Sequence, residues 1–314
     1  MLSRTADHLY WMARYMERAE NIARMLDVNY RMSMMPQSQV QEDQAWGATL
    51  RIMGLEAAFH ERHSEITPDN VLDFMIFEPT NHSSIRSCLL AARENGHAVR
   101  GTLTSELWET TNATWLKMRD FTREEFLDVG PGEFFEWVKY RSHLSRGVTI
   151  GTMLQDESLR FIRIGTFLER ADNTARILDV KYQILLPAGE SEGGAADYYQ
   201  WSALLRSVSA FEVYRKVYRD LITPARVAEL LLLRADMPRS LARCMKEVYA
   251  NLQGVSNAQS AETERQAGEL ESQLRFGKID DIVRGGLHSY TMRLLDRVQS
   301  LGNRIADDFL VPVS

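Results

Sequence analysis

Two segments of the chain carry acidic, amide and basic side chains at helical spacing, and these side chains have the most chemical capacity. The first set is Glu17, Glu20, Asn21, Arg24 and Asp27. The second set is Glu169, Asp172, Asn173, Arg176 and Asp179. Because successive helical residues turn by about 100°, each set occupies one polar face beside an apolar stripe. Carboxylates, amides and guanidinium groups that converge could bind a carboxylate, a phosphate or a metal ion.

Two interpretations of these faces compete. A structural interpretation contains an ion pair within each helix, Glu20–Arg24 and Asp172–Arg176. Such pairs contribute roughly a few tenths of a kcal/mol each, and Glu17 and Arg18 would then bridge to neighbouring buried helices. A functional interpretation lets the two helices meet at a pseudo-twofold axis, where their polar faces surround a ligand. Its candidate binding residues are Glu17, Arg18, Asn21, Arg24, Glu169, Arg170, Asn173 and Arg176.

A third arginine-bearing segment follows His82. Its candidate anion- or partner-binding residues are Arg86 and Arg93, which precede Arg100 at seven-residue spacing. A charge row on a helix is usually a solvated face.

Several motifs that mark metal, nucleotide or serine-hydrolase sites are absent or incomplete. The only E-x-x-H is Glu94 to His97, whereas a dimetal four-helix bundle needs two such motifs and two further glutamates. The sequence has no H-E-x-x-H, no phosphate loop, no dinucleotide fingerprint and no G-x-S-x-G. We therefore predict no metal, no cofactor and no standard nucleotide site, and we leave open whether the chain is an enzyme.

The charged segments are parts of an internal repeat. Residues 15–30 and 167–182 are identical at ten of sixteen positions. Three further pairs of blocks follow in the same order, and the offset drifts only from 152 to 156. These are W-x-A-x-L-R at 46 and 201, I-T-P-x-x-V at 66 and 222, and S-[IL]-x-x-C-[LM] at 84 and 240. We predict two repeats, residues 1–154 and 155–314, in one compact pseudo-symmetric domain.

The repeat also places the two cysteines. Cys88 and Cys244 occupy the same slot of each copy, on an apolar helix face. A nucleophilic cysteine needs a nearby base and partial exposure. We therefore interpret both as small buried hydrophobic residues.

Apolar periodicity predicts an all-α fold. The stripes run through Met12, Met16, Ala19, Ala23, Leu26 and Tyr30, and through Ile164, Leu168, Ala171, Ala175, Leu178 and Tyr182. Thr67-Pro68 and Thr223-Pro224 predict helix starts, because the threonine caps free N–H groups and proline lacks one. The prediction is a helical bundle of roughly ten helices built from two internally duplicated halves, with a mobile loop at 187–196.

Composition narrows the class of protein. The 314 residues carry 37 Lys and Arg against 43 Asp and Glu, for a formal charge of −6. A general nucleic-acid binder would show a basic excess. The longest aliphatic run, 230–233, is far below the roughly 20 residues that span a bilayer. We expect a cytoplasmic protein that binds neither nucleic acid nor membrane.

Three ordered motifs resemble the bacterial alpha-E family, an all-helical domain named for its Glu-Arg motif. They are the doubled pairs Glu17-Arg18 and Glu169-Arg170, the segment from Asn81 to Asn95, and the segment from Ser142-His143-Leu144 to Asp156-Glu157. The likeness covers essentially the whole chain. One departure is His82, where the family pattern has proline.

The resemblance implies a set of partners. Members are typically encoded beside, or fused to, a circularly permuted ATP-grasp protein, often near a transglutaminase-like peptidase. ATP-grasp enzymes join carboxylates to amines, which implies a role in peptide synthesis or peptide tagging with a peptide or amino-acid substrate. The family supplies no catalytic residues to carry over.

Three hypotheses follow. The first is a non-catalytic partner or substrate-binding component of an ATP-grasp amide ligase. The second is an enzyme of the same pathway with its active site at the paired Glu-Arg helices; an open pocket and raised carboxyl pKa values would favour it. The third is a structural assembly module, of which a large apolar surface patch would be the sign.

Overall fold

The computed structural model describes residues 1–34, 39–184 and 195–311, and in these ranges every regular element is a helix. Side chains are described except at 39–42, 180–184 and 195–197. The predicted loop at 187–196 therefore falls almost entirely outside the described residues. The all-α prediction is confirmed.

Sixteen helices occupy the described ranges, where we had predicted roughly ten. The first eight are α1 Ser3–Ser33, α2 Gln39–Met53, α3 Glu56–His60, α4 Pro68–Ile76, α5 Ile85–Ala98, α6 Ser105–Asp120, α7 Arg123–Val129 and α8 Pro131–Thr152. The others are α9 Glu157–Ile184, α10 Ala195–Ser207, α11 Phe211–Tyr218, α12 Pro224–Leu232, α13 Leu241–Gln253, α14 Ala261–Arg275, α15 Ile279–Arg284 and α16 Leu287–Phe309. Turns at Gly54, Ser209 and Gly286 each divide an apolar segment into two helices. Two more helices, α6 and α7, occupy residues 105–129, where apolar periodicity predicts none.

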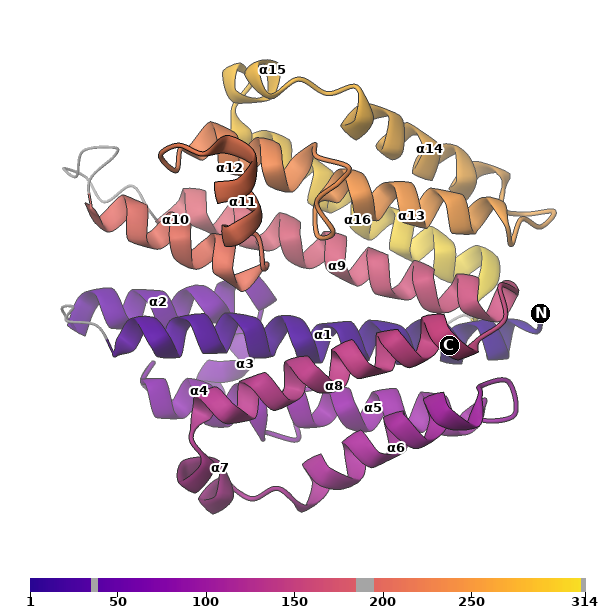
Figure 1. The fold of residues 1–314 in the computed structure, drawn as a ribbon, viewed down its shortest axis with the longest axis horizontal. Helices are drawn as coiled ribbons and strands as arrows, with labels where there is room; N and C mark the ends of the chain where they lie inside the picture. Colours follow the sequence, from indigo (N-terminus) through magenta and orange to yellow (C-terminus); the bar gives the residue numbers. More distant parts are fainter. Residues whose placement is uncertain (35–38, 185–194, 312–314) are drawn as a thin grey trace.

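The two charged segments form the central helices α1 and α9, which pack against each other along their lengths (Figure 1). In Figure 1, α5, α6 and α7 lie below α1, whereas α13, α14 and α15 lie above α9. The centres of the predicted stripes are confirmed, because Ala19, Ala23, Ala171 and Ala175 are completely buried. Tyr30, at the end of the first stripe, is half-buried, and the side chain of Tyr182 lies outside the described residues. Small side chains at a helix contact permit a short interaxial distance.

Chain segments cross between the halves. Helix α2 follows α1 in sequence but contacts α9 as well as α1, and α10 follows α9 but contacts α1 as well as α9. The turn between α2 and α3 also resembles the turn between α10 and α11. Gly54 and Ser209, which are 155 residues apart, both have positive φ, at 68° and 55°, and the N–H groups that follow them return to Leu50 and Leu205.

The predicted Thr-Pro starts are confirmed. Thr67 accepts a hydrogen bond from the N–H of Asn70 at 3.2 Å, and Thr223 accepts one from Arg226 at 3.4 Å. In each helix the proline takes the first turn. These caps fix where α4 and α12 begin.

Candidate functional site

The Glu-Arg pairs of α1 and α9 exchange partners. The Arg170 Nε donates to Glu17 Oε1 at 2.9 Å, and its Nη2 donates to Glu17 Oε2 at 2.8 Å. In the other direction, the Arg18 Nε donates to Glu169 Oε1 at 2.5 Å, and its Nη2 donates to Glu169 Oε2 at 3.1 Å. The arginine of each helix thus donates hydrogen bonds to the glutamate of the other helix. Two bidentate pairs fix the register of α1 on α9.

Aromatic faces support both arginines. The Arg18 guanidinium lies over Tyr15 with 5.5 Å to the ring centroid, and the Arg170 guanidinium lies over Phe167 at 5.2 Å. Tyr15 and Phe167 are matched positions of the repeat. A guanidinium that lies over an aromatic ring can still donate its N–H groups to a carboxylate.

The Glu17 end receives two more arginines. Arg239, in the turn before α13, donates to Glu17 Oε1 at 3.0 Å and to Glu20 Oε1 at 2.6 Å. Arg146 of α8 donates to Glu17 Oε2 at 3.0 Å and also to Glu20 Oε2. Four helices or turns therefore meet on two carboxylates that are almost completely buried.

Glu20 completes the cluster. Its Oε1 accepts from Arg24 at 2.8 Å, and its Oε2 accepts from the Ser142 hydroxyl at 2.6 Å. Glu169 has a second donor as well, Arg14, at 2.7 Å. We call the following set the buried arginine–glutamate network: Glu17, Glu20, Glu169, Arg14, Arg18, Arg24, Arg146, Arg170 and Arg239.

The network keeps its carboxylates ionised. Burial alone would raise the pKa of Glu169, but the charges and hydrogen bonds of Arg14 and Arg18 outweigh it and lower that pKa to about 2. Against the same effect of burial, Arg170 and Arg239 lower the pKa of Glu17. Arg239, with His143, Arg146 and Arg24, lowers the pKa of Glu20 well below its ordinary value. A carboxylate held this way is a weak base, and it carries no proton to donate at neutral pH.

The structure brings five of the ten predicted candidates together. Glu17, Arg18, Arg24, Glu169 and Arg170 all belong to the buried arginine–glutamate network. The predicted intrahelical pairs are also present, with Glu20–Arg24 at 2.7 Å and Asp172–Arg176 at 2.6 Å.

The two asparagines are buried on the same helices. Asn21 Oδ1 accepts from Arg239 at 2.8 Å, while its Nδ2 is a buried donor with no hydrogen-bond partner among the described atoms. Asn173 is buried on α9. Arg24 reaches beyond Glu20 to the Ser209 hydroxyl at 2.6 Å and to His143 Nε2 at 3.0 Å.

Arg86 and Arg93 lie apart from the network. Arg86 donates to the Arg119 carbonyl at 3.2 Å, and Arg93 donates to Asn112 Oδ1 at 3.2 Å and lies over Trp108. Both arginines therefore connect α5 with α6. The second copy has Ala242 and Tyr249 in their places.

Sequence reasoning missed four network members or neighbours: Arg14, Arg146, Arg239 and Ser142. Arg239 had a usable signal, because it precedes the matched serine of the second copy where the first copy has Ser83. Where the two copies differ beside a matched N-cap residue, the differing side chain is a candidate for a contact that only one copy makes. Arg14 and Arg146 gave no signal, since their partners are distant in sequence.

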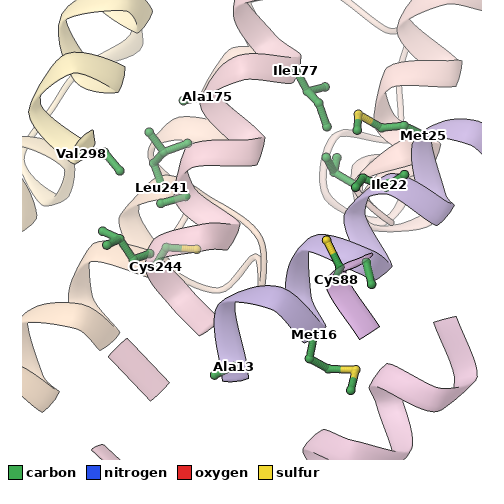
Figure 2. Close-up of a cluster of buried hydrophobic side chains, with 14 of the residues drawn as sticks. Ala13, Met16, Ile22, Met25, Cys88, Ala175, Ile177, Leu241, Cys244 and Val298 are labelled. Atoms are coloured by element: carbon green, nitrogen blue, oxygen red, sulfur yellow. The ribbon is translucent and has the colours of Figure 1, made fainter. Parts of the chain in front are cut away.

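The cysteines are confirmed as buried. Cys88 and Cys244 have no exposed surface, and burial raises the pKa of each thiol to about 12. Figure 2 shows Cys88 beside the α1 side chains and Cys244 near Leu241. Thiols with such a pKa are unreactive at neutral pH.

Neither a cluster of metal ligands nor a membrane-spanning helix occurs among the described residues. No group of three or more His, Cys, Asp or Glu side chains lies close enough to hold a metal ion. Nor does any described helix combine the length and the apolar character that a membrane crossing requires.

A helical protein held together by reciprocal Glu-Arg pairs is the class that this fold and site define. The chain belongs to the Alpha-E family, described as a predicted alpha-helical domain with a conserved ER motif, whose model matches residues 1–310. No curated protein and no solved structure matches the chain.

Proposed function

We propose that this chain is a non-catalytic helical partner of an ATP-grasp amide ligase, which it assists by binding the enzyme or its peptide substrate. Membership in the Alpha-E family supports the proposal, because the family resemblance implies a circularly permuted ATP-grasp neighbour. The reactions in question are peptide synthesis or peptide tagging.

One observation carries the non-catalytic part of the proposal. Each carboxylate oxygen of Glu17, Glu20 and Glu169 accepts a hydrogen bond from at least one arginine. A general base needs a pKa close to the working pH, whereas the arginines lower the pKa of all three carboxyl groups. The alternative, an enzyme with its active site at the paired helices, would need its base elsewhere.

We also infer that two duplicated halves make one domain. The reciprocal pairs support this, because Glu17 with Arg170 and Glu169 with Arg18 are related by the same exchange of copies. The positive φ values at Gly54 and Ser209 add a second matched feature.

The proposal implies a cellular location and a further partner for the chain. A ligase that consumes ATP operates where ATP is supplied, so the proposal places the chain in the cytoplasm. A transglutaminase-like peptidase would be a further partner, acting on the amide bonds that the ligase forms.

The test is reconstitution with an ATP-grasp protein encoded beside this chain. The two proteins should elute together in size-exclusion chromatography, and ATP turnover by the ligase should rise when the chain is added. The chain alone should hydrolyse no ATP. Separate elution together with unchanged turnover would contradict the proposal.

A variant separates partner from enzyme. Glu169→Gln removes the negative charge and keeps the shape of the side chain. After normalisation to the folded fraction, which circular dichroism measures, the non-catalytic role predicts the same stimulation of the ligase. A fall in turnover at an unchanged folded fraction would favour the enzymatic alternative instead.

A further inference from the structure

A cavity of about 440 Å³ lies where α9 and α16 face the turn between α2 and α3. The lining residues that matter most are Arg51, Glu56, Arg176, Asp179, Met292 and Leu295. Its volume falls in the range of about 300–1,000 Å³ that is usual for small-molecule sites. The cavity is distinct from the network, whose carboxylates are enclosed.

The two halves differ in a way that explains this cavity. Asp27 and Asp179 are matched positions; Lys139 of α8 pairs with Asp27 at 2.7 Å, and His288 of α16 contacts Asp179 at 2.6 Å. Lys139 and His288 therefore hold corresponding places on α8 and α16.

Four and seven residues after these places, α8 carries His143 and Arg146, whereas α16 carries Met292 and Leu295. Arg146 fills its space by reaching Glu17 and Glu20. Met292 and Leu295 cannot make such bonds, so the corresponding space in the second half stays open.

Two arginines give the cavity a carboxylate-binding wall. Arg51 Nη1 donates to Glu56 at 3.1 Å, and Arg176 Nε donates to Asp172 at 2.6 Å. Each guanidinium has five N–H donors in a planar fork. With side chains 34% and 27% exposed, both arginines can turn further donors toward a ligand while one carboxylate holds each in place.

Acidic groups balance the arginines. Glu56 and Asp179 line the same cavity, and Asp172 holds Arg176 from the side. Together these carboxylates leave the lining without an excess of positive charge. A simple anion gains little there, whereas a ligand with both an ammonium and a carboxylate matches both signs.

The rest of the lining is apolar. Ile52, Met292 and Leu295 contribute aliphatic surface to the cavity, which favours a ligand with a hydrophobic part. We propose that this cavity binds a short zwitterionic peptide with aliphatic side chains, its carboxylate toward Arg51 and Arg176 and its ammonium toward Glu56 and Asp179.

As a step in peptide ligation the inference rests on the proposed function, to which it adds a peptide site on this chain. As a binding site it rests on the lining alone. The test therefore uses the chain without a ligase. If the chain binds the peptide but does not assist the ligase, only the proposed partner role is refuted. If the chain assists the ligase but does not bind the peptide, only the proposed binding site is refuted.

Isothermal titration of the full chain with four probes tests the ligand class. Leucyl-leucine should bind best. N-acetyl-leucyl-leucine lacks the ammonium, leucyl-leucinamide lacks the carboxylate, and glycyl-glycine lacks the apolar groups. Each should bind roughly tenfold or more weakly, since an unpaired charge or an unfilled apolar wall is left behind. Equal binding of all four, or binding of none, would overturn the proposal.

Two matched pairs of variants place the site. Ala57→Trp should fill the cavity and abolish leucyl-leucine binding, whereas Glu212→Trp, at the matched exposed position of α11, should not. Arg51→Gln should weaken binding roughly tenfold or more, whereas Arg206→Gln, whose guanidinium lies over Phe211, should leave it unchanged. Thermal unfolding checks that each variant is folded. Equal effects of site and control variants would refute the assignment.

Discussion

The buried glutamates of the Glu-Arg motif act as acceptors that arginines share. Glu17 accepts from Arg170, Arg239 and Arg146, and three different elements therefore depend on one side chain. Removing one member of such a network is costly because its partners remain buried and charged. We infer that the buried arginine–glutamate network favours one arrangement of the helices over others.

Glu17→Gln should lower the free energy of unfolding by about 3–5 kcal/mol. The amide keeps the volume but loses the charge that offsets Arg170 and Arg239, both of which are buried. Urea denaturation followed by circular dichroism measures the change.

The control is Glu262→Gln, because Glu262 forms an exposed pair with Arg265 on the surface of α14. Exposed pairs contribute little, so this variant should unfold at the same urea concentration as the parent chain. Similar midpoints for both variants would show that the network does not stabilise the fold.

Acid should destabilise the chain through Glu169. Because its folded pKa is lowered from 4.5 to about 2, the stability it contributes is present above pH 4.5 and is lost as the pH falls toward 2. The difference corresponds to about 3 kcal/mol. Unfolding free energies measured between pH 7 and pH 2 should fall less steeply for Glu169→Gln than for the parent; parallel curves would contradict the assignment.

At the scale of helices, the close contact of α1 and α9 sets the network's geometry. Gly165 marks a close approach of the two backbones: a Cβ there would lie 2.4 Å from the Tyr10 carbonyl oxygen. Because that oxygen belongs to the backbone of α1, it cannot move away by a side-chain rotation. The helices would have to separate.

Gly165→Ala should therefore destabilise the chain by about 1–3 kcal/mol, as overpacked cores do. Gly147→Ala is the matched control, since Gly147 lies within α8 and a Cβ there would meet nothing within 4 Å. The control should be neutral or stabilising by about 0.5–1 kcal/mol because alanine favours helix. Differential scanning calorimetry distinguishes the two; a stabilising Gly165→Ala would refute the close approach.

At the scale of the whole molecule, neither half can complete its own charge pairing. Residues 1–154 contain Glu17 and Glu20 without Arg170 and Arg239, and residues 155–314 contain Glu169 without its arginines. The contacts of α2 with α9 and of α10 with α1 join the halves further. We therefore expect the two halves to unfold as one cooperative unit.

Fragments 1–154 and 155–314 should each fail to form a stable helical fold when they are expressed separately. Burying one side of the network alone leaves charges unpaired. Co-expression should restore a complex that unfolds in one transition. A fragment that by itself shows cooperative thermal unfolding would contradict this prediction.

Much of the fold was predictable because the rules involved are local. Apolar spacing in residues 12–30 and 164–178 gave the buried stripes, and Thr67 and Thr223 gave helix starts. The number of helices was not predictable in this way. Gly54 and Ser209 break helices through positive φ, and for a serine no local rule requires that conformation.

The candidate site was predictable only in part. Pairs four residues apart, such as Asp172 and Arg176, follow from helix geometry. Arg239 reaches Glu17 across 222 residues, and such a contact depends on packing.

By itself, the sequence determined the all-α class, the repeated segments and the residues of the charged faces, because these depend on spacing along the chain. Only the tertiary structure decided where the charges go. The close approach of α1 to α9 places each Glu beside the other helix's Arg, and burial there favours pairing over solvation. The same packing enclosed the glutamates and left a cavity beside Arg176 that Met292 and Leu295 also line.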